Sequence, residues 1–134
     1  MSELSRGILV LDYGSQYTLL IARRLRELGV YCELWPCVDE RLDSFIEEGE
    51  APAAGIILSG GPSSVSIEGS PKLEGGLLEF DVPLLGICYG MQLLADAHGA
   101  SVQPADIGEY GRTTLSVEEA VGLLAGFDVG QQLD

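Results

Sequence analysis

Short runs of branched apolar residues, each followed by a turn rich in glycine or proline, constrain the fold of this chain most strongly. Such runs predict buried β-strands, and they occupy residues 8–11, 30–35, 55–58 and 83–87. Between the runs, apolar side chains recur every three or four residues, as from Leu20 to Leu28, which is typical of one helix face. Strands without polar alternation that alternate with helices predict an open, doubly wound, mostly parallel α/β sheet.

Helical spacing predicts helices at residues 17–28, 42–49, 77–80 and 89–99. In the last third, residues 101–103 and 113–117 predict short strands, and a capping box of Ser116 and Glu119 predicts a helix through Ala125. The alternation of strands and helices predicts another strand at the end of the sequence. We therefore expect the whole chain, residues 1–134, to be the N-terminal portion of one domain whose last part is missing.

The composition excludes several classes of function. Twenty-one acidic residues against 7 basic ones give a formal net charge of −14, which argues against contacts with nucleic-acid phosphates. No apolar run approaches the roughly 20 residues that a membrane-spanning helix needs. The first residues also lack the pattern of a secretion signal. With 46% hydrophobic residues, the sequence predicts a packed protein of the cytoplasm with no membrane or nucleic-acid partner.

Three cysteines and a single histidine limit the metal and disulfide chemistry of the chain. The cysteines are odd in number and include no Cys-x-x-Cys pair, so a disulfide framework or a structural zinc site has little support. We expect no metal site. Cys32 alternates with apolar Val30 and Leu34, which predicts a core side chain.

Cys88 stands in a segment with the form of a nucleophile elbow, Gly86-Ile87-Cys88-Tyr89-Gly90. A tight turn from strand to helix needs small residues on either side, here Gly86 and Gly90. The turn would lift the cysteine above the sheet at the positive end of the next helix, which favours the reactive thiolate. The backbone N–H of Tyr89 would then point to where a tetrahedral oxyanion develops. The alternative is a buried structural cysteine beside two packing glycines.

Two more glycine-bearing turns, at residues 12–16 and 59–62, follow predicted strands. Carboxyl ends of parallel strands meet at one edge of a sheet, where such folds bind ligands. The paired glycines Gly60 and Gly61 could offer backbone N–H groups to an anion as the second half of an oxyanion hole, or could form an ordinary turn. The phosphate loop of ATP pyrophosphatases, Ser-Gly-Gly-x-Asp-Ser, fits poorly because Pro62 interrupts it and the aspartate is absent.

These segments together resemble a known family. Asp12-Tyr13-Gly14-Ser15-Gln16-Tyr17-Thr18, the Gly-Gly-Pro loop at residues 60–62 and the elbow through Gln92 resemble the class I glutamine amidotransferase domain of GMP synthetases. The elbow and the loop are shared by class I amidotransferases generally. The segment at 12–18, the arginine-bearing helix after it and residues 30–35 are similar to GMP synthetases in particular. The resemblance implies a flavodoxin-like sheet.

The resemblance also implies a role for each matching residue. Cys88 would attack the side-chain amide of L-glutamine and form a γ-glutamyl thioester with release of ammonia. Gly61 and Tyr89 would supply the oxyanion-hole N–H groups, and Gln92 would help to hold the substrate. No cofactor is implied for this chain. In the family, ammonia passes to an ATP pyrophosphatase domain or subunit, absent from this chain, where ATP with Mg²⁺ activates xanthosine monophosphate for conversion to GMP.

The acid–base partner that such a cysteine needs is missing from the sequence. In the family a histidine followed two residues later by a glutamate serves the nucleophile, but this chain has only His98. Ten residues along a helix place His98 ~15 Å from Cys88. It is therefore expected at a helix end or on the surface, and the chain alone is expected to hydrolyse glutamine at a negligible rate.

Two other functions fit the same residues. One is a non-catalytic binding module, or a degenerate subunit that acts through a synthetase partner. The other is a different thiol hydrolase on a flavodoxin-like sheet. Arg23, Arg24 and Arg26 lie mostly off the apolar stripe of their helix, which predicts a solvated face, with a docking surface as the alternative.

Overall fold

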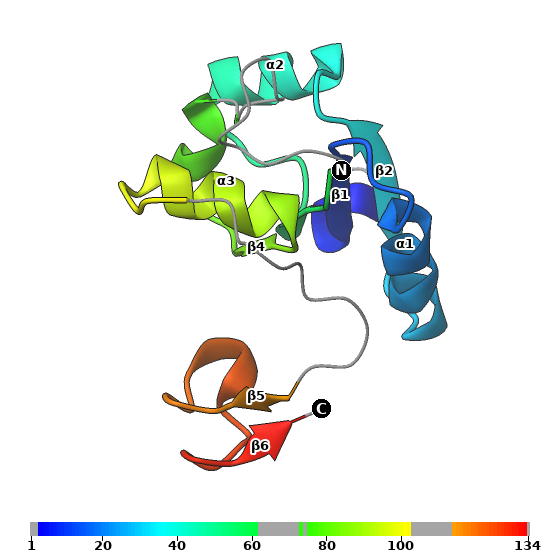
Figure 1. Cartoon of the computed structure of the whole chain (residues 1–134). Coiled ribbons are helices and arrows are strands. Elements are labelled where there is room, and N and C mark those ends of the chain that lie inside the picture. The colour runs from blue at the N-terminus through cyan, green and yellow to red at the C-terminus, as the bar shows by residue number, and fades with distance from the viewer. Residues whose placement is uncertain (1–2, 62–72, 74, 103–113, 134) are drawn as a thin grey trace. The chain divides into compact units, whose positions relative to one another are not determined.

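Four parallel strands form the central sheet of the computed structural model, which describes residues 3–61, 73, 75–102 and 114–133. The strands are β1 (Ile8–Asp12), β2 (Cys32–Pro36), β3 (Gly55–Leu58) and β4 (Leu84–Gly86). Their order across the sheet is β2-β1-β3-β4 (Figure 1). β2 is therefore added on one side of β1, and β3 and β4 are added on the other side. The predicted parallel α/β sheet is confirmed, and a ligand is expected at such a switch point.

Among the described residues, three α-helices accompany this sheet: α1 (Thr18–Glu27), α2 (Glu40–Glu48) and α3 (Tyr89–Ala97). The same part of the chain contains the short 3₁₀ helices η1 (Glu3–Arg6) and η2 (Gly75–Glu79), and η2 overlaps the helix predicted at 77–80. Within the described residues no helix has the length and apolar character needed to cross a membrane.

Local chemistry explains the bounds of α2. The Asp39 carboxylate accepts a hydrogen bond from the Arg41 backbone N–H at 2.9 Å and so caps the first turn. At the other end Gly49 adopts φ 72°, a left-handed conformation that glycine reaches without steric cost. The helix predicted at 42–49 is therefore confirmed, with Gly49 as its C-cap, but it begins earlier than predicted, at Glu40, because Asp39 caps it.

The main hydrophobic core lies on one face of the sheet. Because side chains alternate along a strand, Leu9, Leu11, Ile56 and Leu58 all point to this face, and each is almost fully buried. Helices α2 and α3 and η2 pack on them through one set of buried side chains: Leu42, Leu77, Tyr89 and Leu93. Full burial of each such side chain stabilises the fold by about 1.5–3 kcal/mol.

Helix α1 lies on the opposite face, against β1 and β2. Ala22 of α1 is fully buried, and its carbonyl oxygen accepts a hydrogen bond from the Cys32 thiol at 3.5 Å. The prediction that Cys32 is a core residue is thus confirmed. Beyond α1 this face is less covered, since Leu85 on β4 is 37% exposed.

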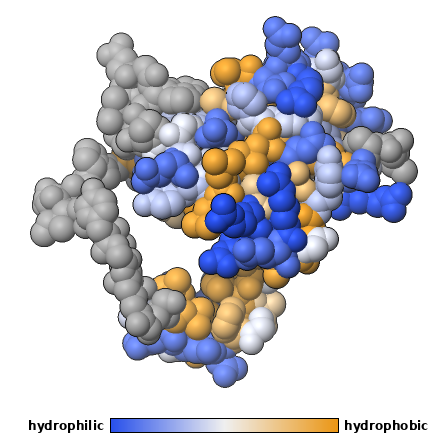
Figure 2. Space-filling model, turned by 90° about the vertical axis from the view of Figure 1, so that its right-hand side faces the viewer, coloured by the Kyte–Doolittle hydropathy of each residue, from blue (hydrophilic) through white to orange (hydrophobic). Residues whose placement is uncertain are grey.

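The outer side of α1 carries both apolar and charged side chains. Leu19 and Leu28 are largely exposed, as are Arg23, Arg24 and Arg26. Figure 2, which looks onto this side of the molecule, shows hydrophobic and hydrophilic surface interleaved. Arg24 pairs with Glu27 at 3.0 Å in an exposed ion pair, which contributes little to stability. The arginines therefore lie on a solvated helix face, as predicted.

The chain divides into two compact units, Met1–Pro104 and Ala105–Asp134. In the second unit β5 (Leu115–Ser116) pairs antiparallel with β6 (Gln132–Leu133), and η3 (Gly122–Leu124) lies between them. The predicted helix from Ser116 through Ala125 is wrong. Ser116 is a strand residue, and Gly122 has φ 56°, a conformation that a continuous helix cannot contain.

The short strand predicted at 101–103 is not formed at residues 101 and 102, and residue 103 lies outside the described residues. The strand predicted at 113–117 is present as β5 at two residues, and residue 113 also lies outside them.

Candidate active site

Cys88 lies in a strained turn between β4 and α3. Its φ of 54° and ψ of −113° are unusual for a residue with a side chain, and among the described residues it alone combines a Cβ with a positive φ. Such a conformation costs of order 1–3 kcal/mol and persists only where the surrounding structure enforces it. The thiol is exposed, so the alternative of a buried structural cysteine does not fit.

Two glycines make this turn possible. A Cβ on Gly86 would lie 2.6 Å from the Gly90 carbonyl oxygen, and a Cβ on Gly90 would overlap the carbonyl group of Leu58. The Ile87 N–H donates to the Leu58 carbonyl oxygen at 2.9 Å, which ties the turn to the end of β3. The spacing of Gly86 and Gly90 around Cys88 therefore reflects close backbone packing, as a nucleophile elbow requires.

The loop after β3 runs directly beside Cys88. A Cβ built on Gly60 would lie 3.4 Å from the Cys88 Cβ and 3.3 Å from the Ser15 Cβ. A Cβ on Gly61 would lie 2.8 Å from the Tyr13 carbonyl oxygen, closer than real side chains approach. The turns after β1, β3 and β4 thus converge on one point, where a Cβ would be tightly packed at Gly60 and would clash at Gly61.

A pocket of about 380 Å³ opens at this point, within the size range of small-molecule sites. Its lining is drawn from all three turns: Gly14, Ser15, Gln16, Tyr17, Gly60, Gly61 and Cys88. Ser15 and Gln16 belong to the turn at 12–16 that the sequence places at the ligand-binding edge of the sheet, although it assigns them no role. Tyr17, the next residue, is an addition from the structure.

Buried aromatic rings support the floor of this region. The rings of Tyr13 and Tyr89 lie 5.8 Å apart at an angle of 46°, and both side chains are nearly inaccessible. This tilted arrangement is favourable for aromatic pairs. The ring contact holds Tyr89, which follows Cys88, against Tyr13, which follows β1.

The other predicted residues lie along α3. Gln92 is one turn past Cys88, partly buried, and its N–H donates to the Cys88 carbonyl oxygen at 3.2 Å. Its side chain is not among those that line the pocket. His98 ends the helix, is exposed, and places its Nδ1 2.7 Å from the Leu94 carbonyl oxygen. The prediction of a helix-end histidine is confirmed.

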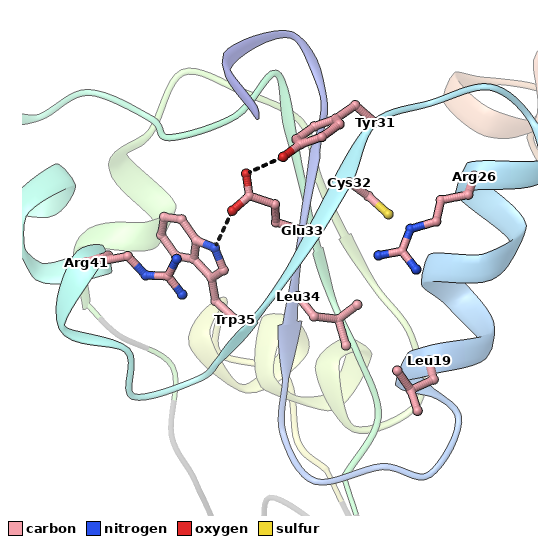
Figure 3. Close-up of a pocket in the computed structure, with 8 residues that line it drawn as sticks. All are labelled: Leu19, Arg26, Tyr31, Cys32, Glu33, Leu34, Trp35 and Arg41. Atoms are coloured by element: carbon pink, nitrogen blue, oxygen red, sulfur yellow. Dashed lines mark hydrogen bonds between the residues drawn. The ribbon is translucent and has the colours of Figure 1, made fainter. Parts of the chain in front are cut away.

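A larger hollow, of about 690 Å³, lies along β2 on a different part of the first unit (Figure 3). Here Glu33 accepts hydrogen bonds from the Tyr31 hydroxyl at 3.0 Å and the Trp35 Nε1 at 3.2 Å. The Arg41 guanidinium lies 4.2 Å from the centre of the Trp35 ring. The hydrogen bond to Glu33 raises the pKa of Tyr31.

This hollow along β2 offers no activated nucleophile. Its cysteine, Cys32, is buried, and its thiol donates a hydrogen bond to a backbone carbonyl oxygen. The described residues also contain no group of three His, Cys, Asp or Glu side chains that could hold a metal ion. The exposed thiol of Cys88, next to Gly60 in a pocket formed by three turns, therefore makes this pocket the candidate active site.

Comparison with known proteins agrees with this fold. A family model described as "Glutamine amidotransferase class-I" matches residues 9–131. The chain therefore belongs to the class I glutamine amidotransferases. Within that class it is of the type found in GMP synthases, as the following three relatives show.

A protein named GMP synthase [glutamine-hydrolyzing] from Psychrobacter arcticus is 46% identical over 123 residues, which are 90% of this chain and 22% of that protein. One of the same name from Debaryomyces hansenii is 48% identical over 98% of this chain and 24% of its own length. A crystal structure described as that of a GMP synthase subunit from Thermoplasma acidophilum superposes with a TM-score of 0.72 at 34% identity, covering 92% of this chain and 60% of that one. The chain thus spans about a quarter of the length of these curated relatives.

Proposed function

We propose that this chain is the glutamine-hydrolysing portion of a GMP synthase, with Cys88 as its nucleophile. The observation that carries the proposal is the exposed thiol of Cys88, held at φ 54° directly beside the Gly60-Gly61 loop. The exposed thiol of Cys88, directly before α3, is accessible to a substrate in the pocket that it lines.

The proposed reaction has two steps. The Cys88 thiolate attacks the side-chain amide carbon of glutamine, and the N–H groups of Gly61 and Tyr89 stabilise the oxyanion that forms. The carbon–nitrogen bond then breaks, the nitrogen takes up a proton and leaves as ammonia, and a γ-glutamyl thioester remains. Water hydrolyses the thioester, which releases glutamate and restores the thiol. Gln92 is proposed to help to hold the substrate.

The ammonia is proposed to be used by a partner domain or subunit. By similarity to proteins named GMP synthase, we propose that ammonia passes to an ATP pyrophosphatase domain or subunit. There ATP and Mg²⁺ would activate xanthosine monophosphate. A location in the cytoplasm is part of the same proposal.

The step that this chain supports least well on its own is proton transfer to the leaving nitrogen. The leaving nitrogen needs an acid, and the single histidine, His98, lies at the far end of the nine-residue α3 with its ring against the Leu94 carbonyl. Loss of the base from a nucleophile–base pair typically removes ~10³-fold or more of the rate. We therefore propose that the 134-residue chain alone has negligible steady-state glutaminase activity.

Labelling with a glutamine-shaped chloromethyl ketone tests the nucleophile, because alkylation needs substrate fit and a reactive thiol but no later proton transfer. We expect a single adduct on Cys88 by peptide mass spectrometry, with labelling slowed by free glutamine and not by asparagine, whose side chain is one methylene shorter. Labelling that glutamine does not slow would overturn the assignment of the substrate. Sustained ammonia release by the chain alone would overturn its proposed inactivity.

A second function is favoured by the position of His98. A non-catalytic module, or a degenerate subunit that acts through a synthetase partner, needs the fold but no acid near Cys88. It predicts that the chain binds an ATP pyrophosphatase subunit equally well with and without Cys88→Ala, and that glutamine does not protect the thiol.

A further inference from the structure

Thr18, the first residue of α1, carries a buried hydroxyl and directly follows Tyr17, which lines the pocket at Cys88. Thr18 is 2% exposed, and its Oγ1 has three neighbours within hydrogen-bond distance. These are Asp12 Oδ1 at 3.1 Å, the Ser15 carbonyl oxygen at 3.2 Å and Ser59 Oγ at 3.0 Å. The last contact joins residues 41 positions apart in the sequence.

The direction of these hydrogen bonds follows from the chemistry of the groups. A hydroxyl has one proton to donate, and an ionised carboxylate or a carbonyl oxygen can only accept. The Thr18 proton therefore goes to Asp12 or Ser15, and the Ser59 hydroxyl donates to Thr18 Oγ1. Ser59 is fully buried, and its other acceptor, the Gly60 carbonyl oxygen, is more distant at 3.4 Å.

The network connects the segments that form the walls of the pocket. Asp12 Oδ1 also accepts from the Gly14 N–H at 2.8 Å, which shapes the turn after β1. Ser59 begins the loop after β3, and its carbonyl oxygen accepts from the Gly90 N–H at 3.1 Å in the first turn of α3. A single hydroxyl thus joins the turn after β1 to the loop that passes Cys88.

We propose that Thr18 is a positioning residue for the glutamine site: its hydroxyl holds the turn at residues 13–17 against the loop at 59–61 and so sets the width of the pocket around Cys88. The inference rests on the proposed function, because it assumes that this pocket receives a glutamine side chain. The backbone turn of Cys88 is set by β4, α3, the flanking glycines and backbone hydrogen bonds to Leu58 and Ser59, and none of these uses the Thr18 hydroxyl. Thr18 therefore governs how well a substrate fits, and not whether the thiol reacts.

This division of roles can be measured by comparing two reagents on the full chain. Iodoacetamide is small and reports the reactivity of Cys88, whereas a glutamine-shaped chloromethyl ketone also reports substrate fit. Thr18→Val keeps the shape of the side chain and removes the hydroxyl. We expect the ratio of the two labelling rates, ketone over iodoacetamide, to fall roughly 10- to 100-fold, the size of effect that a small misplacement of reacting groups produces.

Three further variants complete the experiment. Thr18→Ser, which retains the hydroxyl, should restore most of the ratio. Ser59→Ala should lower it, and combining Ser59→Ala with Thr18→Val should lower it little further, because both changes break one network. Ser44→Ala is the matched control, since Ser44 is an exposed hydroxyl residue on α2 and should leave the ratio unchanged.

Each outcome decides the proposal. If Thr18→Val lowers both labelling rates equally, Thr18 has a structural role only, and the proposal is wrong. If Thr18→Val does not fold, the ratio for Ser59→Ala decides, and an unchanged ratio overturns the proposal. If the wild-type chain shows no preference for the ketone and no protection by glutamine, the proposed function fails first, whatever the variants do.

Discussion

The backbone N–H of Gly90 donates a hydrogen bond to the carbonyl oxygen of Ser59 at 3.1 Å, and this contact joins the first turn of α3 to the loop after β3. It brings a helix and a loop from different parts of the chain to within van der Waals distance. Cys88 therefore lies next to Gly60, and a Cβ built on Gly60 would be 3.4 Å from the Cys88 Cβ.

Native-state alkylation should distinguish the cysteines. Cys88 is exposed, whereas Cys32 is 5% exposed and bonded to the Ala22 carbonyl oxygen. With a small amount of iodoacetamide we expect the first adduct on Cys88, located by peptide mass spectrometry, and no adduct on Cys32 until the chain is unfolded in urea. Earlier labelling of Cys32 would contradict the buried position that the structure gives it.

Replacing Cys88 should reveal the strain in the elbow. A residue with a Cβ is unfavourable at φ 54° and ψ −113°, whereas glycine adopts this conformation freely. We expect Cys88→Gly to raise the free energy of unfolding by about 1 kcal/mol over Cys88→Ala, measured by urea denaturation followed by circular dichroism. Equal stability of the two variants would show that the turn is unstrained.

Gly90, the last residue of the elbow, should tolerate no side chain. A Cβ on Gly90 would overlap the Leu58 carbonyl group, which is backbone and cannot move aside. We expect Gly90→Ala to lower the free energy of unfolding by about 1–3 kcal/mol or to prevent folding.

Gly75→Ala is the matched control, because a Cβ there meets no described atom within 4 Å. It should change stability by less than about 0.5 kcal/mol in the same urea titration. Comparable losses for both variants would mean that the close packing of Gly90 on Leu58 is not the cause.

Stability should depend on pH through Asp39. Hydrogen bonds from the Arg41 side chain and backbone lower the pKa of Asp39 from 3.8 to about 2. A carboxyl with a depressed folded-state pKa stabilises the fold above its unfolded pKa and loses that effect as the pH falls through the folded value. The contribution of Asp39 should therefore be complete above pH 4 and disappear between pH 4 and about 2.

Asp39→Asn isolates this effect, because asparagine caps a helix about as well but cannot form the ion pair with Arg41. We expect the stability difference between wild type and Asp39→Asn, from urea denaturation at several pH values, to shrink as the pH is lowered from 4 to about 2. A difference that stays constant with pH would rule out the ion pair as its source.

Elements with strong local signals agree well between sequence and structure. β3 has the predicted bounds, Gly55–Leu58, and α2 ends at Gly49 as its left-handed cap requires. One failure lies at residues 116–125, where a capping box predicts a helix that does not form, and another at residues 101 and 102, where the predicted strand is absent. Ser116 instead pairs with Gln132 across β5 and β6, and a contact between residues so far apart leaves no trace in a local pattern.

The amino-acid sequence by itself determined the parallel strands, the helices between them and the elbow around Cys88, because apolar periodicity, caps and glycine spacing act over a few residues. Only the tertiary structure decided what surrounds the thiol. The Thr18 and Ser59 hydroxyls, 41 positions apart, meet at 3.0 Å because the parallel sheet places β1 beside β3. Residues 14–17 become a pocket wall for the same reason: strand order, which no local pattern encodes, brings the ends of these strands together.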